Sequence, residues 1–225
     1  MGAALAERGG LDRASPHVTA GDVPPRLVLA STSPQRRAIL EQLRIPFESV
    51  APTYEEHDPP DADPVELVRA HAVGKARSAH RDGDATLGVD TTVHLDGRVY
   101  AKPDGANDAL AMLRELSGRT HSVLSGLCLI TPRGETVGHA ETLVTFRSLE
   151  DDTLAGYVAS GEWESRAGGY AIQGLGGRLV ERIAGDYLNV VGLPGALLVR
   201  TLERELPALL RNMGSVTSEL HSADR

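Results

Sequence analysis

Residues 27–37, with the sequence LVLASTSPQRR, constrain the fold more than any other stretch of this chain. An apolar run stops here at small hydroxyl residues and at Pro34, which suits the first turn of a helix, and Ser33 is a good N-cap. Apolar residues then recur at helical spacing over residues 38–43. The pattern predicts a buried strand that leads directly into the N-terminus of a helix.

The predicted turn collects groups that bind phosphate well. It combines the free N–H groups of a helix N-terminus with hydroxyl and guanidinium side chains. These side chains belong to Ser31, Thr32, Ser33, Arg36 and Arg37. The same residues also suit an ordinary helix cap, so the turn alone leaves both interpretations open.

Composition limits the class of protein. The 225 residues carry a net charge of −8, with 41% hydrophobic and 24% charged residues, which is typical of a globular chain. The acidic balance argues against a nucleic-acid partner, because such proteins need a basic face. Apolar runs stay well short of the roughly 20 residues that span a bilayer, so we expect a cytoplasmic protein without a membrane partner. Cys128 is expected to be a small buried residue.

Strand-like and helix-like segments follow one another along the chain, which predicts an α/β fold. Residues 1–24 lack sustained periodicity and are interpreted as a flexible lead-in, residues 25–211 as one domain, and residues 212–225 as a polar tail. Residues 186–189, with the sequence DYLN, are interpreted as a polar crossing before the last long helix.

Asp90 lies in an apolar, β-rich stretch, where a carboxylate is out of place unless it is capped, paired or used in chemistry. Asp96 and Gly97 form a typical hairpin turn, so the chain is expected to fold back and bring Lys102 near Asp90. A carboxylate and an ammonium group at one opening are the minimum for chemistry on a metal-bound phosphate.

Three further positions each allow two interpretations. Glu56 lies in an acidic, proline-rich loop, where solvated charge competes with metal or base chemistry. Lys75 lies near the C-terminal end of a helix that begins after Asp63, where positive charge is favourable in any case. Gln173 lies in the glycine-rich stretch 161–177, which either approaches a ligand or only makes tight turns. Its amide suits the edge of a nucleobase.

The order of these segments resembles that of the Maf-like nucleoside triphosphate pyrophosphatases. The resemblance runs from about Leu27 to Leu206 and rests on these strings in sequence: LASTSPQRRAIL, the KA pair at 75–76, VDTTV, AKP, LSGRTHSV, VTFR, GEWESRAGGYAIQG and NVVGLP. It implies a long twisted mixed sheet flanked by helices, in two lobes around a central nucleotide cleft, as in Maf and ITPase-like proteins. It also implies a homodimer.

The resemblance implies hydrolysis of a nucleoside triphosphate between the α and β phosphates, which releases the monophosphate and pyrophosphate with a divalent cation, Mg²⁺ or Mn²⁺. Asp90 matches the acidic residue that activates water or holds the metal, and Glu56 matches a second acidic residue at the metal. The phosphate-binding residues implied are Ser31, Ser33, Arg36, Lys75 and Lys102.

The family has one branch selective for dTTP and UTP and another for 7-methylated GTP, distinguished at positions matched by Gln35, Thr91 and Gln173. Thr91 and Gln173 resemble the pyrimidine branch, whereas Gln35 stands where that branch usually has arginine. We therefore expect a house-cleaning pyrophosphatase for dTTP, UTP or modified pyrimidine nucleotides. The alternatives are a pyrophosphatase for 7-methyl-GTP or another purine triphosphate, and a non-catalytic nucleotide-binding regulator of cell division.

Overall fold

The computed structural model describes residues 25–59 and 62–211. In chain order the elements are β1 (Leu27–Ala30), α1 (Pro34–Gln42), β2 (Glu48–Val50), α2 (Pro64–Ala79), β3 (Ala85–Leu95), β4 (Arg98–Tyr100), α3 (Ala106–Leu116), β5 (Thr120–Thr131), β6 (Gly134–Phe146), α4 (Asp151–Ala159), η1 (Ala167–Gly169), η2 (Leu175–Leu179), β7 (Val180–Ala184), α5 (Tyr187–Val191), α6 (Gly195–Glu205) and α7 (Pro207–Arg211). The lead-in and tail expected at residues 1–24 and 212–225 lie outside the described residues. A helix long and apolar enough to cross a membrane is absent from the described part of the chain.

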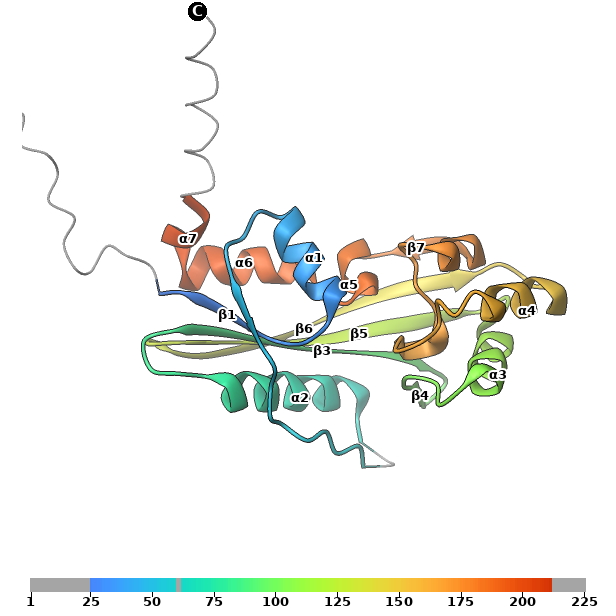
Figure 1. The fold of residues 1–225 in the computed structure, drawn as a ribbon, viewed down its shortest axis with the longest axis horizontal. Helices are drawn as coiled ribbons and strands as arrows, with labels where there is room; N and C mark the ends of the chain where they lie inside the picture. Colours follow the sequence, from blue (N-terminus) through green and yellow to red (C-terminus); the bar gives the residue numbers. More distant parts are fainter. Residues whose placement is uncertain (1–24, 60–61, 212–225) are drawn as a thin grey trace, which may run out of the picture.

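Seven strands form one mixed sheet in the order β2-β1-β3-β5-β6-β7, with β4 beside β3. β1 pairs in parallel with β2 and β3, and the other pairings are antiparallel. Helix α2 covers one face of the sheet, α1 and α6 cover the other, and α3 and α4 lie at the far end (Figure 1). The expected mixed sheet flanked by helices is confirmed.

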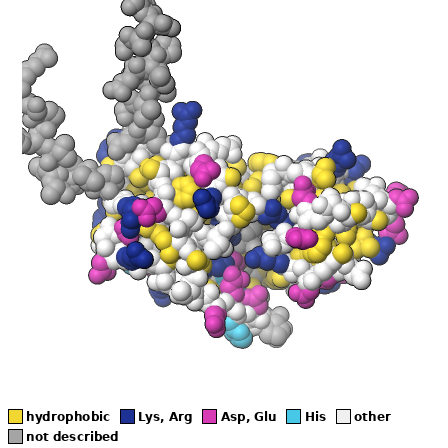
Figure 2. All heavy atoms as spheres, in the orientation of Figure 1, with side chains coloured by type: hydrophobic (Ala, Val, Ile, Leu, Met, Phe, Trp, Pro, Cys, Tyr) yellow, Lys and Arg dark blue, Asp and Glu magenta, His cyan; other side chains and the backbone are white. Residues whose placement is uncertain are grey.

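Two apolar cores share the long strand β3. Leu87 and Val89 pack in the first core with residues of α1 and α6, whereas Val93 and Leu95 pack in the second with residues of α3 and α4. Asp90 therefore lies on the part of β3 that joins the two cores. The surface is hollowed between these two halves of the molecule, with Lys and Arg side chains at the edge of the hollow (Figure 2).

Local sequence signals begin and end the elements where they were predicted. Ser33 is the N-cap of α1 and Pro34 its first residue. The carboxylate of Asp63 accepts hydrogen bonds from the first two free N–H groups of α2, both at 3.0 Å. Asp96 and Gly97 adopt positive φ angles of 50° and 82° at the β3–β4 hairpin. Cys128 is fully buried, as expected.

The segment predicted as a polar crossing is instead the start of helix α5. Asp186 caps this helix by accepting from the N–H of Leu188 at 2.9 Å, and it also accepts from the N–H of Ala196 at 2.9 Å. Asn189 is fully buried and donates to Val123 O at 3.0 Å. The polar side chains of this segment serve internal partners, a local one at Leu188 and a distant one at Val123, and this is why the segment reads as a polar crossing in the sequence.

Two glycines let α2 approach the sheet more closely than side chains permit. A Cβ atom at Gly88 would lie 2.1 Å from Ala72 O, and one at Gly126 would lie 2.1 Å from Val68 O. Backbone oxygens of α2 therefore rest directly on β3 and β5. This close approach fixes the distance between α2 and Asp90, because Asp90 pairs with Gly126 in the sheet.

Replacement of Gly126 by alanine is expected to destabilise the fold by about 1–3 kcal/mol, because the helix must move away from the sheet. Urea unfolding measures the change. Gly156→Ala is the control, since Gly156 lies inside α4 and a Cβ there meets nothing within 4 Å in the described part of the chain. That variant is expected to gain roughly 0.5–1 kcal/mol. Equal stability of Gly126→Ala and the wild type would show that the helix is not seated on the glycine.

Buried His121 predicts a pH dependence of stability. Burial lowers its pKa to about 4, against an unfolded value of about 6.5. Between these values the unfolded chain binds a proton that the folded chain does not, so stability falls as the pH drops from about 6.5 to about 4. The loss reaches about 3 kcal/mol at the lower end.

The variant His121→Gln tests this dependence, because glutamine does not titrate and retains a polar partner for the Tyr170 hydroxyl, which lies 2.9 Å from His121 Nε2. Urea unfolding across the pH range is expected to give a shallower slope for the variant than for the wild type. Parallel stability curves would contradict the assignment.

Candidate active site

A cleft of about 520 Å³ opens between the two halves. Small-molecule sites commonly have volumes of this order. The predicted site residues that line it are Ser31, Ser33, Gln35, Arg36, Glu56, Lys75, Thr91, Lys102 and Gln173. Asp90 lies behind this lining and contacts it through Lys75. The predicted residues thus meet at one cleft, and their chemical roles stay predictions.

The hydroxyls of the β1–α1 turn organise the turn itself. Ser31 Oγ accepts from the N–H of Ser33 at 3.1 Å and from Arg36 Nη1 at 3.2 Å. Ser33 Oγ accepts from the N–H of Arg36 at 3.4 Å and donates to Gln35 Oε1 at 3.1 Å. The turn therefore caps α1, and in doing so it fixes a guanidinium group at the cleft, while its phosphate-binding role stays a prediction.

Arg36 connects three distant parts of the chain at the cleft wall. Its Nε donates to Gly192 O at 3.0 Å, and its Nη2 lies 3.5 Å from Thr91 Oγ1 on β3. Burial lowers the pKa of Arg36, and the charges of Asp90 and Glu56 act in the opposite direction. Because a guanidinium group remains protonated in proteins, Arg36 is a fixed positive charge.

Asp90 and Glu56 share one ammonium group. Lys75 Nζ lies 2.5 Å from Asp90 Oδ1 and 2.6 Å from Glu56 Oε1. The loop that carries Glu56 lies against α2, since a Cβ at Gly74 would lie 2.3 Å from the ring of Tyr54. Helix α2, strand β3 and the loop therefore place two carboxylates beside the ammonium group of Lys75.

Asp90 is only 9% exposed, yet it is ionised at neutral pH. Burial by itself would raise the pKa of Asp90. The hydrogen bond of His71 and the positive charges of Lys75 and Arg36 outweigh that effect and hold the pKa well below its usual value. The cleft thus keeps a buried carboxylate anionic next to cationic side chains.

His71 belongs to this cluster and was missed by the sequence analysis. It lies one turn before Lys75 on the inner face of α2, and its Nδ1 lies 3.5 Å from Asp90 Oδ2. The hydrogen bond with Asp90 raises the pKa of His71, although burial lowers it. A spacing of four residues from Lys75 was the signal that could have identified it.

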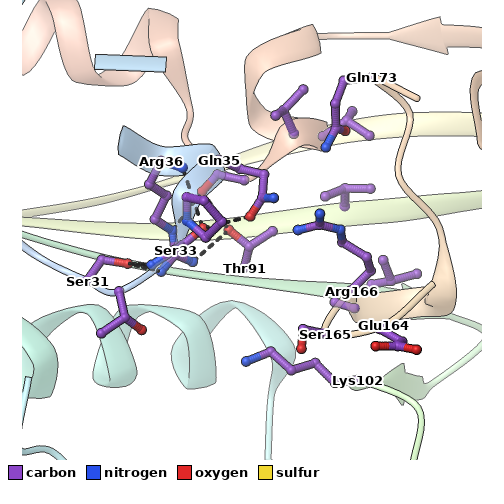
Figure 3. A pocket seen from close by; sticks show the side chains of 18 of the residues that line it. Ser31, Ser33, Gln35, Arg36, Thr91, Lys102, Glu164, Ser165, Arg166 and Gln173 are labelled. Atoms are coloured by element: carbon purple, nitrogen blue, oxygen red, sulfur yellow. Dashed lines mark hydrogen bonds between the residues drawn. The ribbon is translucent and has the colours of Figure 1, made fainter. Parts of the chain in front are cut away.

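The opposite wall of the cleft carries further positive charge. Lys102, from the loop after β4, and Arg166, which precedes η1, extend toward Arg36 and Thr91 in Figure 3. Arg166 Nε is buried and finds no hydrogen-bond partner among residues 25–59 and 62–211. Arg166 is not among the site residues predicted from the sequence, although it is the one basic residue of the glycine-rich stretch before Gln173.

Gln173 is held at the cleft edge by Glu162. The two carboxylate oxygens of Glu162 accept from the N–H of Leu175 at 3.0 Å and from the N–H of Gly176 at 2.9 Å. A side chain at Gly174 would overlap this carboxylate, because its Cβ would lie 2.1 Å from Glu162 Oε1. The glycines therefore both allow tight turns and keep Gln173 beside the cleft (Figure 3).

The cluster below the cleft fits a divalent cation. Glu56, His71 and Asp90 each offer one ligand atom, and these atoms all lie within 4.8 Å of one another. Two carboxylate oxygens and an imidazole nitrogen are common ligands of divalent metals. Lys75 Nζ already lies among the same carboxylates, so the cluster attracts positive charge.

The fold and the cleft define an α/β protein with a small-molecule-sized cleft edged by positively charged side chains. The family model described as Maf-like protein matches residues 26–205, and the chain belongs to that family. A solved nucleoside-triphosphatase/dITP/XTP pyrophosphatase from Mycobacterium abscessus covers 55% of this chain and 75% of its own at 21% identity and a TM-score of 0.37, too low to support an argument.

Curated relatives are similar over most of the chain. A dTTP/UTP pyrophosphatase of Nitratidesulfovibrio vulgaris is 45% identical over 199 residues, which cover 86% of this chain and 90% of the relative. The dTTP/UTP pyrophosphatase of Deinococcus radiodurans is 43% identical and covers 79% and 92%. That of Moorella thermoacetica is 47% identical and covers 75% and 89%.

Replacement of Glu162 by alanine is expected to loosen the segment that carries Gln173, because two backbone N–H groups lose a charged acceptor. Hydrogen–deuterium exchange at Leu175 and Gly176 is expected to become roughly tenfold faster. Glu164→Ala is the matched control, since Glu164 is exposed at the same cleft and makes no side-chain hydrogen bond within the described residues. Unchanged exchange in Glu162→Ala would show that the carboxylate does not hold this segment.

Proposed function

We propose that this protein is a nucleoside triphosphate pyrophosphatase that hydrolyses dTTP, UTP or modified pyrimidine nucleotides between the α and β phosphates, in a house-cleaning role. The observation that carries the proposal is the ionised, buried Asp90, which lies behind a cleft edged by Arg36, Lys75 and Lys102. The relatives named dTTP/UTP pyrophosphatase support the substrate class.

The cations of the cleft meet the main electrostatic requirement of this reaction. A nucleophile that attacks a triphosphate is repelled by its charge, and pyrophosphate leaves with additional negative charge. Arg36 faces the substrate from one wall and Lys102 and Arg166 from the other (Figure 3), and Lys75 also lines the cleft. Positive groups on both sides stabilise the transition state because they are already oriented before the substrate arrives.

Asp90 orients the attacking water and accepts its proton as the bond to phosphorus forms. A carboxylate with a strongly lowered pKa is a weak base, so its larger contribution is to position the water and to hold positive charge. Glu56 and Asp90 are the residues that would hold the divalent cation, Mg²⁺ or Mn²⁺. When bound, the cation neutralises phosphate oxygens and lowers the pKa of a water molecule.

Two amides at the cleft suit a pyrimidine base. Gln35 and Gln173 each offer one donor and one acceptor, which complement the carbonyl groups and the N–H of uracil or thymine. The hydroxyl of Thr91 is already engaged, at 2.8 Å from Ser125 Oγ and 3.2 Å from Gly192 O. Thr91 therefore contributes to selectivity by fixing the wall next to Arg36. We further propose a homodimer, which rests on the family resemblance, and a cytoplasmic location, which rests on the short apolar runs of the sequence.

The variant Asp90→Asn is expected to lower the rate of pyrophosphate release from dTTP and UTP by about a hundredfold or more, because the attacking water loses the carboxylate that positions it and accepts its proton. Direct detection of pyrophosphate with Mg²⁺ or Mn²⁺ measures the rate, and circular dichroism checks the fold. Asp152→Asn, which changes an acidic residue on the surface of α4, serves as the control with unchanged turnover.

The same assay separates the alternatives. Unaltered turnover in Asp90→Asn would reject its assigned role. Faster hydrolysis of 7-methyl-GTP or ITP than of UTP would reject the pyrimidine class. This comparison is necessary because Gln35, which lines the cleft, stands where the pyrimidine branch usually has arginine. Orthophosphate without pyrophosphate would place the cleavage at the γ-phosphate, and nucleotide binding without any release would indicate a regulator.

A further inference from the structure

His71 is a buried titratable side chain beside Asp90 that the proposed reaction does not use. It is 2% exposed and lies on the face of α2 that Gly88 and Gly126 bring onto the sheet. A buried imidazole must find partners for both ring nitrogens or lose stability. The partners of His71 indicate what it does.

One ring nitrogen faces the carboxylates at the cleft. His71 Nδ1 lies 3.5 Å from Asp90 Oδ2 and 3.9 Å from Glu56 Oε2. The three residues can each turn one ligand atom toward a common point, since these atoms lie within 4.8 Å of one another. The geometry is that of a small cation site with two oxygen ligands and one nitrogen ligand.

The other ring nitrogen faces acceptors outside the cluster. His71 Nε2 lies 3.2 Å from Asp58 Oδ1 and 3.4 Å from His57 O. Both partners accept hydrogen bonds and hold the hydrogen on Nε2. The Nδ1 hydrogen, which Asp90 accepts, is released as a proton when a cation takes its place. Metal-binding histidines are oriented in this way by a carboxylate or a carbonyl on the far nitrogen.

The ring is also fixed by packing. Tyr54 meets the imidazole edge-on, with ring centroids 5.8 Å apart and an interplanar angle of 60°. Tyr54 lies against Gly74 of α2, the helix that carries His71. The close contact between the loop and this helix therefore sets the position of the Tyr54 ring. A ligand that is held in one orientation loses little freedom when it binds a metal.

We propose that His71 Nδ1 is the third protein ligand of the divalent cation, together with Glu56 and Asp90. This proposal rests on the proposed function. An imidazole nitrogen suits Mn²⁺, Co²⁺ and Zn²⁺ better than Mg²⁺, which prefers oxygen ligands and retains its waters. The chain therefore selects transition metals at this site, and Lys75 Nζ leaves the two carboxylates when the cation binds.

Metal binding to the full chain without nucleotide tests the proposal. Calorimetry is expected to show tighter binding of Mn²⁺ than of Mg²⁺ by the wild type. In His71→Leu the Mn²⁺ affinity is expected to fall by roughly ten- to a hundredfold, whereas the Mg²⁺ affinity changes much less. His139→Leu, which changes an exposed histidine on β6, is the matched control and keeps both affinities.

Pulsed electron paramagnetic resonance of the Mn²⁺-loaded wild type gives a second readout that does not depend on the folding of a variant. We expect coupling to a directly bound imidazole nitrogen, and its loss in His71→Leu. Absence of nitrogen coupling in the wild type, or retention of Mn²⁺ affinity in a folded His71→Leu, would overturn the proposal.

The two proposals fail in different ways. A wild type that releases pyrophosphate but shows no nitrogen coupling would remove His71 from the metal and leave the enzyme assignment standing. A wild type that shows the coupling but releases no pyrophosphate from any triphosphate would leave the metal ligand standing and reject the proposed function.

Discussion

The site depends on the close contact between α2 and the sheet. Gly88 and Gly126 leave room for backbone oxygens of the helix against β3 and β5, so the helix lies closer to Asp90 than a pair of ordinary side chains permits. His71 and Lys75, one turn apart on that helix, then reach the carboxylate directly. Without this contact the charged groups would be too far apart to compensate one another.

The buried charges are tolerated because they are paired. An isolated ionised carboxylate in an apolar interior is strongly unfavourable, and partners at hydrogen-bond distance restore most of the lost solvation. Lys75 bridges Asp90 and Glu56, and Arg36 is held by Ser31 and Gly192 O. The electrostatic arrangement that keeps Asp90 anionic is therefore the one that provides positive groups for phosphate. Stability and the proposed chemistry use the same contacts.

The two apolar cores place these groups between them. β3 runs through both cores and carries Asp90 and Thr91 at the junction, while the glycine-rich segment that bears Arg166 and Gln173 reaches the cleft from the second half. Residues from the two halves thus contact one ligand without competing for space in either core. This division lets charged side chains from both halves line a single cleft.

The sequence by itself determined the local elements, because Ser33, Pro34, Asp63 and the pair Asp96–Gly97 act through neighbours a few residues away. The sequence also indicated which residues could belong to the site. Asp90 is a carboxylate in an apolar stretch, and the other predicted residues were matched through the resemblance to the Maf-like family. Only the tertiary structure decided that His71 faces Asp90, that Arg166 lines the cleft, and that the polar segment after Asp186 is a capped helix. The contacts of His71 and Arg166 depend on residues far away in the chain, as does the burial of Asn189 against Val123, and no local pattern specifies such a distance.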